Sequence, residues 1–411
     1  MQPIAMFGGR HYRATLIRRV RNPTSTTERF RRIRPVVSAP TGRLNVQTMA
    51  SHPTFGVEEE FLLADPTTGE PVAENKAVAA HAAEHGVKLQ LELSSCQVET
   101  TSEVVGGSDA LRKELTRLRS IAAEAAKANG AQLLAAALPP TRQHDFPITD
   151  TPRYREIADK FGMVAEEGVC GAHVHVAVPS REAAIRVSNR LRPWLPLFLA
   201  LSANSAVYSN ADTGYASWRS IVWARWPSAG PPPHFDSVDE YDGMVRMLQR
   251  AGAALDDGMV YWDVRPSAKF PTVEVRVADV PATVADTVLL ATLIRASVMT
   301  ALNDERCGEP TPPLSPHALK AAYWKSARDG LDGEAIDLLE THGPVSARKL
   351  LEHLVEHVRP ALEAVGDYDM VVTEVARVDD EGNGAMRQRR AWRSRHDVKD
   401  VIAELAAATL S

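Results

Sequence analysis

The order of apolar and polar residues along this 411-residue chain follows two different periods. Apolar residues at every second position predict strands with one buried face, and apolar residues at every third or fourth position predict amphipathic helices. The first pattern predicts strands over 56–63, 87–93, 170–178 and 272–279, and a buried strand or short helix over 132–138. The second predicts helices over 75–86, 108–129, 152–166, 181–208, 237–252, 282–303, 316–364 (broken at Gly330, Gly343 and Pro344) and 397–409.

The predicted strands place polar groups on one face, and the predicted helices lie between and after them. This arrangement indicates an α+β fold in which an antiparallel or mixed sheet has one open, polar face and one face covered by helices. Residues 209–235 fit neither period, although they contain tryptophans and arginines. A long connection of this kind in a compact domain is typical of a functional loop, and its tryptophans indicate that it is ordered.

Residues 1–48 differ in composition from the remainder of the chain. The first 50 residues contain ten arginines, no lysine and a single acid, Glu28. We expect 1–48 to be a disordered, arginine-rich extension and 49–411 to form a single domain. Translation that begins at Met49 is the explanation we favour, and a transit peptide or a basic arm that binds a polyanion are the alternatives.

Charge and cysteine content restrict the class of protein. After residue 50 the chain holds 37 basic and 51 acidic residues, which is unfavourable for binding nucleic acid. No stretch approaches the roughly 18 uninterrupted apolar residues that a membrane span needs. The three cysteines (Cys96, Cys170 and Cys307) lack a metal-ligand spacing, so we expect reduced thiols in a cytoplasmic protein. The long apolar helices leave a homodimer open.

The first predicted strand contains three consecutive carboxylates, Glu58, Glu59 and Glu60. Because side chains alternate along a strand, Glu58 and Glu60 point to one face and Glu59 points to the other. Two like charges on one face repel each other unless a cation lies between them, and hard cations such as Mg²⁺ are held by carboxylate oxygens. The alternative is a solvated acidic edge.

Two later strands repeat this arrangement of paired polar groups. His173 and His175 share one face of an otherwise Val/Ala strand, which favours ligands or phosphate contacts. Glu274 and Arg276 share a face of the strand over 272–279, where a cross-strand ion-pair ladder is the alternative. A cup of carboxylates with histidines and arginines suits a nucleotide held through two or more Mg²⁺ ions. No Walker A, kinase glycine loop or GxGxxG sequence is present.

Near the C-terminus, Gly382-Asn383-Gly384 is followed by Arg387, Arg389 and Arg390. A glycine-rich turn with clustered arginines predicts a mobile loop that closes over phosphate. A solvated basic turn is an equal alternative on spacing alone.

Six short motifs, taken together, resemble the type 2 glutamate–cysteine ligase family, also called the carboxylate–amine ligases. In chain order they are Gly56-Val57-Glu58-Glu59-Glu60, Gln97-Val98-Glu99, Gly171-Ala172-His173-Val174-His175, Asp212-Thr213-Gly214-Tyr215-Ala216-Ser217, Trp262-Asp263-Val264-Arg265-Pro266-Ser267 and Thr272-Val273-Glu274-Val275-Arg276. The resemblance extends from about Phe55 to Trp392. Residues 1–48 lie outside it.

The resemblance implies a glutamine-synthetase-like fold, in which a curved, mainly antiparallel sheet forms an active-site funnel backed by helices. It also implies a reaction. ATP phosphorylates the side-chain carboxylate of glutamate, and an amine, by the family's name L-cysteine, attacks the acyl phosphate to give γ-glutamylcysteine, ADP and phosphate. The expected cofactors are ATP and Mg²⁺, or Mn²⁺ in its place. The expected partners are therefore small molecules, and neither nucleic acid nor a membrane.

By this likeness we assign three sets of site residues. The expected metal ligands are Glu58, Glu60, Glu92, Glu99, His175 and Glu274. The expected catalytic arginines are Arg276, Arg219 and Arg265. The expected contacts to ATP and substrate are Arg225, Tyr215, Trp218, Trp262, His173 and Arg387, where the three aromatic residues wall the amino-acid pocket.

Three other functions stay open on the sequence alone. A ligase of the same family can join glutamate to a different amine. A phosphagen-kinase-like phosphotransferase uses carboxylates, arginines and Mg·ATP but leaves the phosphate on its substrate. A metal or nucleotide sensor on the same fold lacks catalysis, although the intact set of acids argues against it.

Overall fold

A seven-stranded sheet organises the part of the chain that the computed structural model describes, residues 52–142 and 146–411. Its strands pair in the order β2-β3-β1-β5-β9-β8, with β4 also paired to β1, and these pairings are antiparallel. The strands are β1 (Phe55–Ala64), β2 (Gln90–Leu91), β3 (Gln97–Thr101), β4 (Gln132–Leu134), β5 (Gly171–Ala177), β8 (Val264–Pro266) and β9 (Thr272–Asp279). Two small hairpins lie outside this sheet: β6 (Val207–Tyr208) with β7 (Ala211–Asp212), and β10 (Glu334–Ile336) with β11 (Pro344–Ser346).

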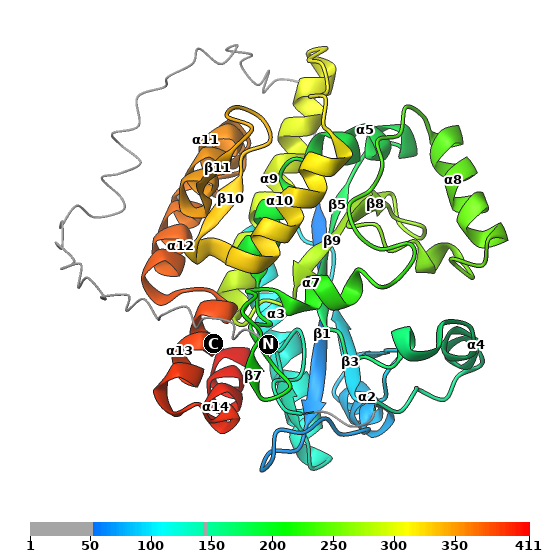
Figure 1. The fold of residues 1–411 in the computed structure, drawn as a ribbon, viewed down its shortest axis with the longest axis vertical. Helices are drawn as coiled ribbons and strands as arrows, with labels where there is room; N and C mark the ends of the chain where they lie inside the picture. The colour runs from blue at the N-terminus through cyan, green and yellow to red at the C-terminus, as the bar shows by residue number, and fades with distance from the viewer. Residues whose placement is uncertain (1–51, 143–145) are drawn as a thin grey trace, which may run out of the picture. The chain divides into compact units, whose positions relative to one another are not determined.

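Helices make up most of the remainder (Figure 1). They are α2 (Asn75–Glu84), α3 (Ser108–Ala128), α4 (Pro152–Phe161), α5 (Arg181–Leu191), α6 (Leu195–Ser202), α7 (Trp218–Trp223), α8 (Val238–Arg250), α9 (Val284–Arg306), α10 (Pro316–Asp329), α11 (Ala347–Val365), α12 (Tyr368–Glu381), α13 (Gly384–Arg395) and α14 (Val398–Thr409). Thr151, Ser180, Ser217, Ser237 and Thr283 each accept a backbone N–H bond at a helix N-terminus. Such caps satisfy donors that the first helical turn leaves without partners.

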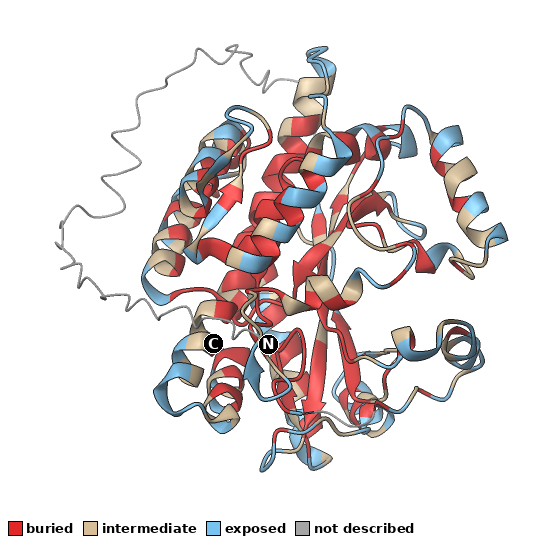
Figure 2. Ribbon diagram, in the orientation of Figure 1, coloured by how far each residue is buried: buried red, intermediate tan, exposed pale blue. Residues whose placement is uncertain are grey.

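The helices cover the face of β1 to which Glu59 points. Glu59 is fully buried, where its carboxylate accepts two bonds from Arg119 of α3 and one from Thr287 of α9. Helix α9 packs against α3, α5, α6, α11 and α12, and in Figure 2 it is buried along most of its length. The opposite face of β1 carries Glu58 and Glu60, both half-buried. The predicted α+β sheet with one polar face is therefore confirmed.

Helix α9 is long and apolar enough, by length and composition alone, to cross a membrane. However, 89% of its apolar window is buried inside the protein. A helix that is apolar on all sides also occurs at the centre of a large core, and the packing of α9 against five other helices gives it that place.

Several predicted elements are shorter than expected or differ in kind. Only Gln90–Leu91 of the predicted strand 87–93 pairs, because Val87 and Leu89 enter the core from the turn after α2. Prolines at 193 and 196 divide the predicted helix 181–208 into α5 and α6, since proline disrupts a helix interior. The irregular segment 209–235 contains the short helix α7, and a β10–β11 hairpin interrupts the helices predicted over 316–364.

The predicted mobile loop near residue 384 is wrong, because the arginines of that segment lie on helix α13. Asn383 accepts the N–H of Met386 and so caps this helix, and its amide donates to the carbonyls of Ala200 and Leu201. The glycine-rich segment predicted as a turn is therefore the buried N-terminus of a helix. The predicted extension 1–48 lies outside the described residues, and the division of the chain at that point stays a prediction.

Candidate active site

Strand register brings the polar residues of five strands together on the open face of the sheet. Glu58 of β1 lies opposite His173 of β5, and Glu60 lies opposite Glu99 of β3. On the next pair of strands, His175 lies opposite Glu274, and Glu274 lies opposite Arg265 of β8. Because alternate residues of a strand share a face, these side chains form one continuous polar surface across β3, β1, β5, β9 and β8.

His173 stands at the centre of this surface. Its Nδ1 lies 3.2 Å from Glu58 Oε2, and its Nε2 lies 3.6 Å from Glu60 Oε1. The neighbouring His175 directs its Nε2 to within 3.6 Å of Glu58 Oε1 and 4.0 Å of Glu274 Oε1, and its Nδ1 lies 3.0 Å from the hydroxyl of Thr272. The two imidazoles therefore connect the carboxylates of β1 to that of β9.

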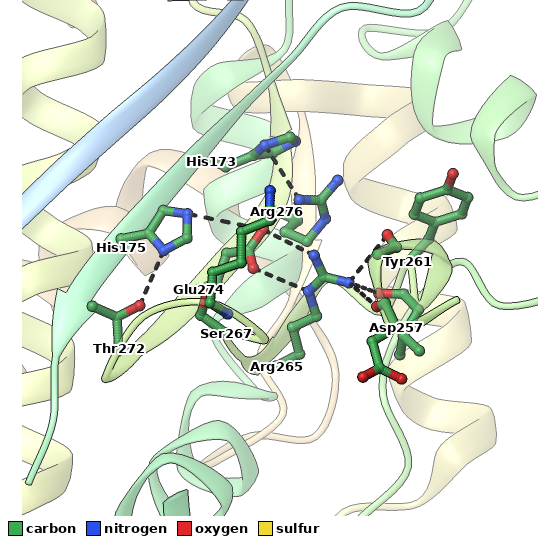
Figure 3. A network of polar contacts seen from close by, with 12 residues as sticks. His173, His175, Asp257, Tyr261, Arg265, Ser267, Thr272, Glu274 and Arg276 are labelled. Atoms are coloured by element: carbon green, nitrogen blue, oxygen red, sulfur yellow. Dashed lines mark hydrogen bonds and ion pairs between the residues drawn. The ribbon is translucent and has the colours of Figure 1, made fainter. Parts of the chain in front are cut away.

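A bulge in β9 sets the position of Arg276. The register between β5 and β9 shifts between Ala172 and Val174, so that β9 has one extra residue opposite His173. Bulges of this kind re-aim a side chain and are common next to active sites. Here the Arg276 guanidinium reaches Glu274 and lies 3.3 Å from His173 Nδ1 (Figure 3).

Arg265 supports Glu274 from the edge strand. Its Nε donates to Glu274 Oε2 at 3.0 Å and its Nη2 to Glu274 Oε1 at 3.4 Å. Its Nη1 donates to backbone carbonyls of the turn at 257–260, including that of Asp257 at 3.3 Å (Figure 3). Most of the donors of Arg265 are thus already used within the protein.

Burial and charge together set the protonation of the carboxylates. Burial opposes ionisation of Glu58, but the neighbouring imidazoles of His173 and His175 outweigh it and lower the pKa of Glu58 below its ordinary value. Burial likewise opposes ionisation of Glu274, yet Arg276 and Arg265 hold its pKa well below the usual range. Both carboxylates are therefore ionised at neutral pH.

The pKa values of two other acids, Glu92 and Glu99, are raised instead. Burial and the nearby charge of Glu60 raise the pKa of Glu92 to about 8. Burial and the charge of Glu92 raise the pKa of Glu99 well above its ordinary value. The face therefore carries more carboxylates than its own cations neutralise, and a bound cation would favour their ionised forms.

The donor atoms fit divalent cations. One oxygen or nitrogen from each of Glu58, His173 and Glu274 lies within 4.8 Å of the others, and the same holds for Glu60, Glu99 and His173. In addition, His175 Nε2 is buried and has no hydrogen-bond partner among the residues described. Carboxylate oxygens with an imidazole suit Mg²⁺ or Mn²⁺. The geometry brings His173 into both groups, whereas we expected His175 to be the metal ligand, and neither group includes Glu92.

Arg219 lies beside this face on α7. Its guanidinium packs so closely against Gly171 that a Cβ there would stand 2.3 Å from Nη2. Gly171 in turn donates its N–H to Glu60 Oε2 at 2.6 Å. The Nε of Arg219 is buried without a hydrogen-bond partner in the described part of the chain, and Asp279 lies 3.8 Å from its Nη1. Arg219 therefore packs against the residue that bonds to Glu60, and its Nε is a donor still available.

The other predicted substrate contacts lie in different surroundings. Trp262 is buried against Phe235 and Tyr241 in a hydrophobic cluster, so it is a core residue in this structure. Arg225 pairs with Glu167 at 2.7 Å on a partly exposed surface.

Tyr215 and Trp218 pack on each other. The guanidinium of Arg328 from α10 also lies over the ring of Tyr215 in a cation–π contact. Arg387 on α13 pairs with Glu381 and the carbonyl of Gly382. In the part of the chain that the structure describes, none of these residues contacts the carboxylates of the sheet through a hydrogen bond or ion pair, and their roles stay predictions.

Two residues next to the site were not predicted. Thr272 shares a face with Glu274 two positions along the strand, so period-2 alternation could have found it. Tyr261 belongs to an aromatic cluster with Trp223 and Trp226, and burial raises its pKa to about 12. No local sequence signal connects Tyr261 to the carboxylates.

Comparisons with known proteins agree with this geometry. The model of "Glutamate-cysteine ligase family 2 (GCS2)" matches residues 54–404. A protein from Mycobacterium sp. (strain KMS) named "Putative glutamate--cysteine ligase 2-2" is 67% identical over 364 residues, which are 88% of this chain and 100% of the relative. A "Putative glutamate--cysteine ligase 2-3" from Mycolicibacterium smegmatis is 68% identical over the same shares.

Solved structures show the same fold at low sequence identity. The glutamate–cysteine ligase from Francisella tularensis in complex with AMP has a TM-score of 0.61 and 14% identity, over 87% of this chain and 88% of that one. The bifunctional glutathione synthetase from Pasteurella multocida gives the same TM-score and identity over 87% of this chain, which spans about half (52%) of that protein.

An antiparallel sheet with a carboxylate-rich open face and helices behind it is the fold of these solved enzymes, and with the family match it defines an ATP-dependent ligase. The chain belongs to glutamate–cysteine ligase family 2.

Proposed function

We propose that this ligase joins the γ-carboxylate of glutamate to an amine, with L-cysteine as the first candidate, through an acyl phosphate. The observation that carries the proposal is the pair of three-donor groups that share His173 directly beside Arg276. The family and the names of the relatives support cysteine as the amine.

The reaction balances in two steps. A γ-carboxylate oxygen of glutamate attacks the γ-phosphorus of ATP, the bond to the bridging oxygen breaks, and ADP leaves. The nitrogen of the amine then attacks the acyl carbon, phosphate leaves, and the nitrogen loses one proton. The products are the γ-glutamyl amide, ADP and phosphate.

The residues of the open face divide into metal-holding and charge-stabilising groups. Glu58, Glu274 and His173 would hold a divalent cation, or Glu60 and Glu99 would hold it with His173, because a neutral imidazole offers one nitrogen lone pair to a metal. Bound Mg²⁺ or Mn²⁺ would supply positive charge that lowers the cost of bringing an anionic nucleophile to an anionic phosphate.

The arginines supply permanent positive charge at the same face. Arg276 is half-buried, and although burial opposes its charge, Glu274 raises its pKa, so it stays charged. A fixed guanidinium of this kind stabilises charge that develops on a transferring phosphoryl group. Arg219 is suited to a substrate carboxylate because its buried Nε lacks a partner in the described structure.

The test is a measurement of ADP release with Mg·ATP, glutamate and a panel of amines that includes cysteine, with products identified by mass. We expect cysteine-dependent turnover that gives γ-glutamylcysteine. Turnover with a different amine would keep the ligase and change its substrate. A phosphorylated product without amide would contradict the proposal in favour of a phosphotransferase, and ATP binding without turnover would favour a sensor.

A further inference from the structure

Asp279 is a fully buried acid that no step of the proposed reaction uses. It is the last residue of β9, where its backbone pairs with Gly171 of β5. Its carboxylate accepts three hydrogen bonds at 2.8 Å, from the backbone N–H of Asn204 and the hydroxyls of Ser205 and Ser217. Burial of a carboxylate is costly without such partners. The bonds that satisfy Asp279 therefore also hold its partners in fixed positions.

Two of these partners connect Asp279 to the first turn of helix α7. Ser217, which ends one of the six sequence motifs, caps α7 by accepting the N–H of Ser220 at 3.2 Å and donates its hydroxyl to Asp279 Oδ1. Ser205 accepts the backbone N–H of Arg219 at 3.0 Å and donates to Asp279 Oδ2. A hydroxyl has one donor, and in both serines that donor is directed to the acid. Asp279 thus fixes α7 at its cap and at the backbone of Arg219.

The side chain of Arg219 lies over the same end of the sheet. Its guanidinium packs against Gly171, where a Cβ would stand 2.3 Å from Nη2, and lies 5.7 Å from the centre of the Trp223 ring. Asp279 Oδ1 is 3.8 Å from Nη1, which is close enough to compensate the charge but too far for a hydrogen bond. The buried Nε has no hydrogen-bond partner among the residues described. The acid therefore stabilises the charge of Arg219 and leaves a donor available.

We propose that Asp279 is a positioning residue: through Ser205 and Ser217 it sets the place of α7, and it holds the guanidinium of Arg219 ready for a substrate carboxylate. The inference rests on the proposed function in one respect, that Arg219 binds such a carboxylate. Arg265 differs, because it donates to Glu274 and to backbone carbonyls, so most of its donors are used within the protein.

The first test follows Arg219 without any substrate. In the full-length protein labelled with ¹⁵N, its Nε–H gives a side-chain signal in the ¹H–¹⁵N spectrum, which is identified by its loss in Arg219→Gln. Asp279→Asn keeps the size of the side chain but removes its charge and replaces one acceptor oxygen by an amide NH₂. We expect exchange of the Nε–H with solvent to become at least about tenfold faster in this variant. An unchanged exchange rate would overturn the proposal.

The second test is a double-mutant cycle in steady-state turnover, with the substrates that the unmodified protein accepts. Asp279→Asn should raise the KM for an amino-acid substrate at least about tenfold, because its carboxylate loses a correctly placed partner, and leave the KM for Mg·ATP within about twofold. In an Arg219→Gln background the same change should add less than about twofold, because no guanidinium is left to position. Additive effects would overturn the proposal, and so would a loss confined to kcat.

A matched pair of milder variants keeps the proposal testable where Asp279→Asn fails to fold. Ser217 and Ser180 each cap a helix by accepting an N–H at 3.2 Å, and Ser217 also donates to Asp279. Loss of either cap destabilises a helix by a similar amount. Ser217→Ala should raise the same KM at least about threefold, and Ser180→Ala should leave it unchanged. Equal KM values in the two variants would overturn the proposal.

The outcomes separate this proposal from the proposed function. Absence of turnover with every amine in the unmodified protein would contradict the proposed function, whereas the exchange rate of the Arg219 Nε–H would still decide whether Asp279 positions this side chain.

Discussion

At the scale of single residues, His173 determines how the site is organised. Its two nitrogens face carboxylates on opposite sides, Glu58 at 3.2 Å and Glu60 at 3.6 Å. Burial and Arg276 lower the pKa of His173, which favours a neutral imidazole at neutral pH. A neutral imidazole can act as a ligand, whereas a protonated one cannot.

The first prediction concerns Glu58, which contacts both histidines. Glu58→Gln should lower ATP turnover at least about 100-fold, because removal of one ligand costs at least as much as removal of a supporting residue. The measurement is ADP release, with the Kd for ADP determined in parallel. Glu70→Gln, at an exposed position after β1, is the control. Turnover within twofold of the unmodified protein would contradict the assignment of Glu58.

The second prediction concerns the pH dependence of stability without metal. The pKa of Glu92 is raised to about 8 in the folded protein, so the folded state holds this proton more tightly than the unfolded chain does. Its contribution to stability is therefore full at low pH and is lost as the pH rises toward about 8.

This loss is measured as the difference in melting temperature between the unmodified protein and Glu92→Gln in EDTA. Because Gln cannot ionise, the variant should become more stable relative to the unmodified protein between pH 6 and pH 9. A difference that stays constant over this range would show that Glu92 is not held in the raised state.

At the scale of elements, strand β1 is held to the helices by an ion pair on its covered face. Glu59 of β1 and Arg119 of α3 are both fully buried and form an ion pair. Arg119 also donates to the carbonyls of Pro281, Ala282 and Thr409. A single guanidinium thus ties β1 and α3 to the start of α9 and the end of α14. We infer that this network fixes the position of β1 relative to the helices behind it. The positions of Glu58 and Glu60 on the open face follow from it.

Removal of one partner of this pair should leave a buried charge without compensation. Arg119→Met is therefore expected to lower the free energy of unfolding by about 3–5 kcal/mol. The exposed pair of Arg155 and Asp150, with 61% and 69% of the two side chains accessible, is the matched control, and Arg155→Met should cost at most about 1 kcal/mol. Urea denaturation measures both. Equal losses in the two variants would contradict the role of the network.

The sequence predicted the central strands and most helices because their periodicity is local. The stripe Leu111, Leu115 and Leu118 of α3 is buried as expected, and β1, β5 and β9 lie where period-2 alternation placed them. What the sequence could not predict depends on contacts between distant segments. The arginine-containing segment forms helix α13 because the Asn383 amide at its start donates to two carbonyls of α6. Trp262 is a core residue because α8 packs over it.

The same distinction applies to the site. The acids and histidines share one face by simple alternation, so their meeting was predictable. The place of His173 in both possible metal groups was not, because it depends on the bulge in β9 and on the hydroxyl of Thr272. Residues on irregular segments, such as Tyr215 and Arg225, had no periodic pattern to place them.

At the scale of the whole molecule, the chain gathers an excess of buried and half-buried acids on one face and covers the other face with an apolar helical layer (Figures 1 and 2). Such an arrangement costs stability unless cations bind, because the acids repel one another. The open face of the sheet, whose acids are unfavourable for folding without cations, can therefore serve catalysis. The membership of the chain in a ligase family agrees with that use.

The central claim is that ATP phosphorylates the carboxylate of glutamate before the amine attacks. It is tested most directly with glutamate that carries ¹⁸O in both γ-carboxylate oxygens, in unlabelled water with Mg·ATP and the accepted amine. The mass of the released phosphate is then measured. We expect every phosphate released in amide formation to carry one ¹⁸O atom from glutamate. Unlabelled phosphate would contradict an acyl phosphate and with it the proposed chemistry of this face.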